Sequence, residues 1–205
     1  LGISTLGRVP GLDYQHIGRV LDGGAQGIII PHIDDGHSAA RAVALCRYPP
    51  LGYRSATALL PQLSFAQVPI GEATVLINQE TLLVVMLETE RAIRNVEEIA
   101  ATDGIDVLLV GTNDLCLEMG IPGEFDHPRI VQCFEKVVAA CVRHKRSAGM
   151  GGIYRPELMA RYIESGVRMV LSGTDLTFLM AAARAQASAV RDIATSFCKK
   201  TPPVA

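Results

Sequence analysis

The chain has 205 residues, of which 49% are hydrophobic and 20% charged, and its net charge is -2. This composition is typical of a globular protein with a sizeable core, and it argues against binding to nucleic acid or to an anionic membrane surface. No apolar stretch is long enough to span a bilayer, and five cysteines without C-x-x-C spacing predict reduced thiols in a cytoplasmic protein.

Short apolar runs alternate along the chain with segments of helical periodicity. The runs are continuous, as expected for strands that are buried on both faces. We predict strands at Leu6–Val9, Gly27–Pro31, Leu82–Glu88, Asp106–Val110, Ala148–Ile153 and Met169–Leu171. Helices are predicted at Asp13–Leu21, Asp35–Cys46, Arg91–Ala100, Pro128–His144, Pro156–Ser165 and Leu176–Ile193. This alternation predicts βαβ units and a parallel sheet.

The junctions between helices and strands repeat one pattern, in which a glycine precedes the next apolar run. Gly23 or Gly24, Gly104 and Gly166 are therefore predicted helix C-caps, where a positive φ costs glycine little. The pattern breaks over residues 47–81, which we predict to be a long loop with a short helix near its end. Such a loop is either functional or a surface excursion without a role.

Six βα units can form an open doubly wound sheet or part of a closed barrel. The open sheet is disfavoured because residues 6–13, LGRVPGLD, which include the first strand and the residues that follow it, lack a Gly-rich phosphate loop. A (β/α)8 barrel needs eight units and about 250 residues. The chain starts at Leu1, almost against the first strand, so we expect the natural N-terminus upstream. We predict an α/β (β/α)8 TIM barrel that lacks about its first two βα units, with one domain over residues 1–198 and a disordered tail over 199–205.

In a barrel, functional groups lie at the carboxyl ends of the strands. Glu88 and Asp114 each follow an apolar run, on strands that we predict to be neighbours. Adjacent strands are about 4.8 Å apart, so the two carboxylates could share one divalent cation. The alternative is a role as helix N-caps, because Asp114 could cap a short helix and Glu88 lies just before one. Arg8, within the first strand, suits a carboxylate substrate, although the residues alone favour pairing with an acid. None of the four lysines lies at a predicted strand end, so Schiff-base chemistry is not expected.

Several segments together resemble the HpcH/HpaI family of class II 2-oxo acid aldolases, from about Leu6 to about Ile193. They are GAQGIIIPHI, CRYPPLGYRS, LVVMLETERAIRNVEEI, IDVLLVGTNDLCLEMG, HPRIVQCFEKVV and GVRMVLSGTDLTFL. The resemblance implies a metal-dependent, reversible cleavage of 4-hydroxy-2-oxo acids to pyruvate and an aldehyde. It also implies a homo-oligomer, often a hexamer, with an exchanged C-terminal helix.

The resemblance also implies roles for individual residues. Glu88 and Asp114 match the metal carboxylates, with Mg²⁺, Mn²⁺ or Co²⁺ as the ion, and Arg8 matches the arginine that contacts pyruvate. The backbone of the turn that receives the pyruvate carboxylate corresponds to Gly111, Thr112, Asn113 and Asp114.

Some positions depart from the family pattern. Met86 stands where a Gln is common, GTND replaces the usual GPAD, and Ser55 replaces a usual Gly after Arg54. The resemblance places the acid/base Asp-x-x-His motif on a strand before Leu1, outside this chain. The first prediction is therefore a 2-oxo acid aldolase. The alternatives are a citrate-lyase-β-type enzyme that acts on acyl-CoA thioesters and a non-catalytic barrel paralogue that serves as a binding or assembly subunit.

Overall fold

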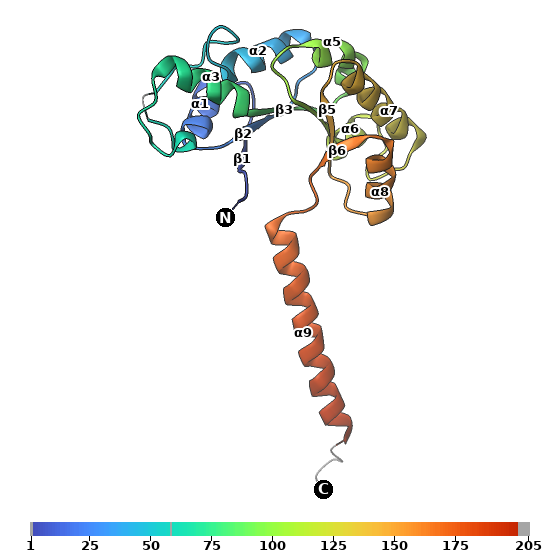
Figure 1. The fold of residues 1–205 in the computed structure, drawn as a ribbon. Helices are drawn as coiled ribbons and strands as arrows, with labels where there is room; N and C mark the ends of the chain where they lie inside the picture. The colour runs from blue at the N-terminus through green and yellow to red at the C-terminus, as the bar shows by residue number, and fades with distance from the viewer. Residues whose placement is uncertain (1, 58, 201–205) are drawn as a thin grey trace. The chain divides into compact units, whose positions relative to one another are not determined.

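The computed structural model describes residues 2–57 and 59–200, which fall into two units, Leu1–Leu171 and Ser172–Ala205. The first unit contains a six-stranded parallel sheet in which the strands are ordered as they occur in the chain (Figure 1). The strands are β1 (Leu6–Arg8), β2 (Gly27–Ile30), β3 (Leu82–Leu87), β4 (Val107–Gly111), β5 (Ser147–Gly151) and β6 (Val167–Val170). Each predicted strand overlaps one of them, and the predicted parallel α/β architecture is confirmed.

The first unit contains the predicted helices and, directly after β4, a short helix that was not predicted; two further differences concern a division at Asn95 and the long loop. They are α1 (Tyr14–Asp22), α2 (Gly36–Cys46), η1 (Pro61–Leu63), α3 (Ile70–Glu80), α4 (Glu90–Arg94), α5 (Val96–Ala101), α6 (Thr112–Glu118), α7 (Pro128–Arg143) and α8 (Pro156–Ser165). The helix predicted at Arg91–Ala100 is divided at Asn95 into α4 and α5. The long loop carries both the 3-10 helix η1 and the helix α3.

The sheet separates two apolar layers of different composition. Side chains alternate between the faces of a strand, and Ile28, Ile30 and Val85 point toward the layer of helices. Figure 1 shows α1, α2, α5, α7 and α8 along that outer face of the curved sheet. The opposite, inner face carries a smaller cluster made of Ile29, Val84, Met86, Val107 and Leu109. This arrangement, with parallel strands, outer helices and an apolar inner layer, is consistent with a TIM-barrel-like fold.

Glycines with positive φ stand at the predicted junctions. Gly24, Gly104 and Gly166 have φ values of 104°, 96° and 121°. Added Cβ atoms at Gly104 and Gly166 would lie 2.7 Å from Val43 Cγ1 and from Val138 Cγ1, respectively. The chain therefore needs glycine there for its backbone conformation and also for the close approach of a neighbouring helix.

The cysteines of the first unit are buried and free. They are Cys46, Cys116, Cys133 and Cys141, whereas the Cys198 side chain lies outside the described residues. Burial raises the pKa of the Cys46 and Cys141 thiols to about 12, which keeps both protonated near neutral pH. These thiols act as small core side chains, in agreement with the prediction.

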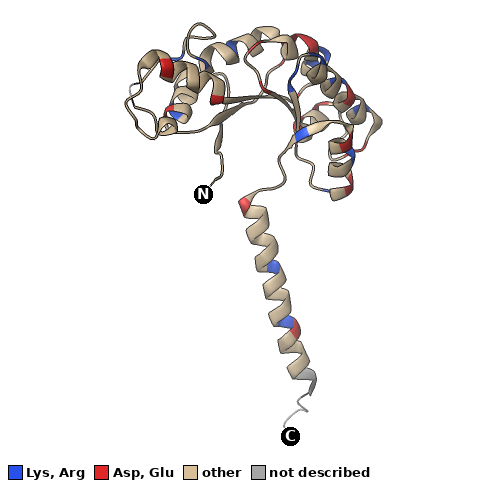
Figure 2. Ribbon diagram, in the orientation of Figure 1, with Lys and Arg blue, Asp and Glu red and all other residues tan. Residues whose placement is uncertain are grey.

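The second unit is built around α9 (Asp175–Lys200). This helix extends beyond its predicted end at Ile193, so residues 199 and 200 of the predicted tail are helical, while 201–205 lie outside the described residues. Figure 2 shows few charged residues along α9. Large apolar side chains on it are exposed in the single chain, namely Leu176, Phe178, Leu179, Met180, Val190, Ile193 and Phe197. No helix in the described part of the chain is long and apolar enough to cross a membrane.

Candidate active site at the carboxyl ends of the strands

Glu88 lies directly after β3 and belongs to the inner face of the sheet. Val84 and Met86 are inner-face residues, and the period of two along a strand places Glu88 on the same face. Its side chain is only 1% exposed. β4 pairs with β3 so that Leu87 is opposite Val110, and Gly111 is the next residue. A Cβ at Gly111 would lie 2.5 Å from Glu88 Cγ, so the missing side chain provides the space that Glu88 occupies.

The two carboxylate oxygens of Glu88 have different environments. Oε2 accepts a hydrogen bond of 2.8 Å from the backbone N–H of His32 and lies 3.0 Å from His32 Nδ1. Oε1 is buried and has no hydrogen-bond partner among the described residues. A buried carboxylate oxygen without a partner is costly, and its negative charge can be balanced by a bound cation.

Asp114 lies in the first turn of α6, the short helix that begins directly after β4. Gly111 is the N-cap residue of this helix, and no side chain caps it, so Asp114 does not act as an N-cap. The Asp114 side chain is exposed. Thr89, rather than Glu88, caps α4. The alternative interpretation of Glu88 and Asp114 as helix caps is therefore wrong.

The turn between β4 and α6 leaves polar groups without partners. Thr112 Oγ1 is buried and unpartnered among the described residues, and the first N–H groups of a helix have no intrahelical acceptor. The Asn113 amide lies over Gly152, because a Cβ there would be 2.7 Å from Asn113 Nδ2. Gly152 follows β5 and has a φ of 90°. The carboxyl end of β5 is therefore in contact with this turn.

Arg8 is the last residue of β1 and is exposed. Leu6 packs against the inner cluster, so Arg8, two residues later, has the inner-face parity. Among the described residues, its side chain makes no hydrogen bond or ion pair. No acidic residue in the described part of the chain forms an ion pair with Arg8, so this part of the structure does not support the alternative that Arg8 pairs with an acid of the sheet.

The donors present suit a cation that keeps much of its coordination open. The described residues contain no group of three or more His, Cys, Asp or Glu that could hold a metal ion. Mg²⁺ is usually bound through one or two carboxylates, with waters and substrate oxygens completing its shell. The unpartnered Oε1 of Glu88 and the exposed carboxylate of Asp114 fit this type of site.

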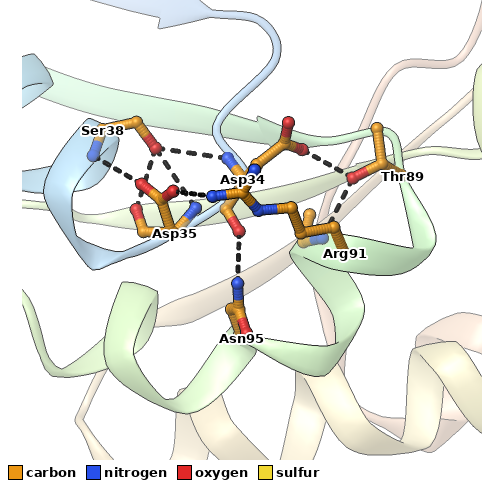
Figure 3. Close-up of polar contacts among 7 residues, drawn as sticks. Asp34, Asp35, Ser38, Thr89, Arg91 and Asn95 are labelled. Carbon is orange, nitrogen blue, oxygen red and sulfur yellow. Dashed lines mark hydrogen bonds and ion pairs between the residues drawn. The ribbon is translucent and has the colours of Figure 1, made fainter.

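A polar network joins the loop after β2 to the segment that follows Glu88 (Figure 3). Thr89 Oγ1 donates to Asp34 Oδ1 at 2.5 Å, and Asn95 Nδ2 donates to the Asp34 carbonyl at 2.9 Å. Arg91 forms an ion pair with Asp35, which caps α2 by accepting from the Ser38 N–H. That hydrogen bond is the main reason why the pKa of Asp35 is lowered. The network fixes the two loops to each other.

His32 is the site residue that the sequence interpretation left without a role. It lies two residues after the end of β2, which was the available signal, but only the tertiary structure brings it to Glu88.

The long loop over residues 47–81 is anchored at the opposite end of the sheet. Its Arg47 binds the Thr81 and Gly104 carbonyls, before β3 and β4, and Gln62 binds the Ala25 carbonyl, before β2.

Comparisons with known proteins agree with this geometry. Residues 2–182 match the HpcH/HpaI aldolase/citrate lyase family. A 4-hydroxy-4-methyl-2-oxoglutarate aldolase from Chaetomium globosum is 38% identical over 94% of this chain and 73% of its own length. A 5-keto-4-deoxy-D-glucarate aldolase from Salmonella paratyphi C is 34% identical over 82% of this chain and 65% of its own length. The crystal structure of an HpcH/HpaI aldolase from Desulfitobacterium hafniense has a TM-score of 0.84 and 30% identity, and the alignment covers 98% of this chain and 74% of that one.

Proposed function

Because this chain belongs to the HpcH/HpaI aldolase/citrate lyase family and is a carbon–carbon lyase, we propose that it cleaves a 4-hydroxy-2-oxo acid. The products are pyruvate and a second carbonyl compound, and the reaction is reversible. The names of the relatives support an aldolase over a citrate-lyase-type enzyme acting on acyl-CoA thioesters. Small 2-oxo acids are therefore the substrate class, with the second carbonyl compound left open.

The single observation that carries the proposal is the buried Glu88 carboxylate with one unpartnered oxygen. The family is one of metal-dependent aldolases and lyases. In this chain Glu88 and Asp114 would hold the ion, and the oxygen ligands suit Mg²⁺, Mn²⁺ or Co²⁺. A divalent ion bound there supplies Lewis-acid polarisation of the 2-oxo group.

Arg8 and the turn after β4 would bind the substrate. Arg8 is exposed at a strand position that belongs to the inner face of the sheet, and its guanidinium has no partner among the described residues. It can therefore bind the pyruvate end of the substrate. The backbone N–H groups of Gly111, Thr112, Asn113 and Asp114 would receive the carboxylate, because the start of α6 leaves such groups free. These residues orient the substrate above the inner layer.

The inner apolar cluster lies on the same face of the sheet as Glu88 and Arg8. Met86 is 8% exposed and packs in this cluster with Ile29, Val84 and Leu109. A methionine cannot bind the substrate through hydrogen bonds as the usual glutamine could, so its contribution is packing and exclusion of water. Binding therefore relies on Arg8, the turn after β4 and the two carboxylates.

Exchange of the methyl protons of pyruvate tests this function directly. In D₂O with Mg²⁺, Mn²⁺ or Co²⁺, the full-length protein should replace these protons by deuterium, as followed by NMR. Glu88→Gln should abolish exchange without unfolding the protein, and Glu80→Gln is the matched control because Glu80 is exposed at the end of α3, before β3. Failure of the folded protein to exchange with any of the three ions would refute the proposal.

The apolar surface of α9 supports a homo-oligomer as the working form. Exposed side chains such as Phe178, Leu179 and Phe197 form a surface that a second copy of the chain could cover. Sedimentation velocity would detect the assembly, and Leu179→Glu should weaken it. A monomer at micromolar concentration would contradict this part of the proposal. The buried, reduced cysteines are the basis for placing the enzyme in the cytoplasm.

A further inference from the structure

His32 has a backbone conformation that is uncommon for a residue other than glycine. Its φ is 57°, in the left-handed region, which a residue with a side chain adopts only at a cost in free energy. The surrounding structure must hold the residue in this conformation, and such residues cluster at functional sites. The network around Asp34 and Thr89 supplies part of that constraint, because it fixes the loop after β2 to the start of α4.

This conformation directs two groups of His32 to one oxygen of Glu88. The backbone N–H donates to Oε2 at 2.8 Å, and Nδ1 lies 3.0 Å from the same Oε2. Oε1, the other oxygen, is left buried and unpartnered. With Glu88 ionised, a neutral imidazole with a proton on Nδ1 donates the second hydrogen bond. The two bonds together restrict rotation of the carboxylate group.

We infer that His32 is a positioning residue for Glu88, which holds Oε2 so that Oε1 is presented to the divalent cation. The inference rests on the proposed function, because it takes Glu88 as a cation ligand. Groups that hydrogen-bond a metal-binding side chain fix its orientation, and their loss typically weakens metal binding by about 10- to 100-fold. His32 fits this role from both its backbone and its side chain.

Mn²⁺ binding to two variants of the full-length protein separates positioning from a contribution to folding. His32→Gly keeps the backbone N–H and favours a positive φ, so its thermal midpoint should not fall. Its Mn²⁺ dissociation constant, from the electron paramagnetic resonance signal of the free ion, should rise about tenfold. His32→Asn should restore most of the affinity, since Asn tolerates this conformation and offers an amide donor.

Lys145→Gly is the matched control, because Lys145 is exposed and has a φ of 55° after α7. It should leave the Mn²⁺ dissociation constant unchanged. Equal affinity of His32→Gly and the unmodified protein would overturn the inference and leave the proposed function standing, as would an affinity of His32→Asn no higher than that of His32→Gly. An unmodified protein that binds no Mn²⁺, or binding that persists in Glu88→Gln, would overturn the metal site itself and the inference with it.

Discussion

At the amino ends of β3 and β4, the buried guanidinium of Arg47 makes four hydrogen bonds. It donates to the carbonyls of Asn78, Thr81 and Gly104 and to Oδ2 of Asp106. At the carboxyl ends of the same two strands, the buried carboxylate of Glu88 has one oxygen with two donors and another with none. Both charges are almost fully buried, at 3% and 2% exposure for the two residues.

The difference separates stability from function within one sheet. A buried charge is tolerated when most of its hydrogen bonds are made, as for Arg47, in which both terminal nitrogens have acceptors and only Nε lacks one among the described residues. A buried charge with a free lone pair lowers stability unless a ligand completes it, as for Glu88. In barrels the loops at the carboxyl ends carry the chemistry and the amino ends carry stability. The two ends should therefore respond in opposite ways to similar substitutions.

The largest expected effect is at the amino end. Arg47→Met removes all four hydrogen bonds and leaves Asp106 and three carbonyls without this donor, so the free energy of unfolding should fall by about 3–5 kcal/mol. Urea unfolding followed by circular dichroism measures this. Arg41→Met is the matched control, because Arg41 is exposed on α2, the helix that ends at the C-cap residue Arg47, and its effect should stay within about 0.5 kcal/mol. Equal losses in both variants would remove the basis of the comparison.

The same change from acid to amide should have opposite signs at the two ends. Asp106→Asn weakens the acceptor of the Arg47 and Leu83 hydrogen bonds and should cost about 2 kcal/mol of unfolding free energy. Glu88→Gln removes a buried charge and should raise the unfolding free energy of the metal-free protein by about 1 kcal/mol. Chemical denaturation in the presence of a chelator measures both. A loss of stability in Glu88→Gln would mean that Glu88 is a structural acid.

A smaller effect is expected where Thr89 links the two loops at the carboxyl end. Thr89→Ala removes the N-cap hydrogen bond to the Ala92 N–H, at 3.0 Å, and the donor to Asp34. The expected cost is about 1–2 kcal/mol, measured by thermal unfolding. Thr89→Ser keeps the hydroxyl and should retain most of the stability. If the serine variant were as unstable as the alanine variant, the methyl group rather than the hydrogen bonds would be responsible.

The smallest effect is the acid sensitivity of the cap at Asp35. The Ser38 N–H is the main cause that lowers the pKa of Asp35 below its ordinary value of 3.8, so the folded state favours the ionised form. Its stabilising contribution is present above pH 3.8 and is lost as the pH falls through the lowered pKa. The urea midpoint should fall less between pH 5 and pH 3 in Asp35→Asn than in the unmodified protein. An identical fall in both would contradict this.

The sequence was sufficient to predict the strands of the sheet and the positions of the two acids, Glu88 and Asp114, after the carboxyl ends of β3 and β4. Buried parallel strands require continuous apolar runs such as those before Glu88 and Asp114, and glycines such as Gly104 and Gly166 mark the helix ends. The break at Asn95 was missed because Ala92, Ile93 and Val96 keep an apolar face across it. The end of α9 was placed too early, although Lys199, Lys200 and Pro202 are sequence signals for a helix end near residue 200.

The sequence by itself determined the parallel α/β architecture and the family, because strand periodicity and local motifs are encoded by residues close together in the chain. Only the tertiary structure decided which atoms meet at the site. The positive φ of His32, the contact of Glu88 with Gly111 and the free Oε1 each depend on segments that are far apart in the chain and are brought together by the register of parallel strands. No periodicity within one segment encodes such contacts.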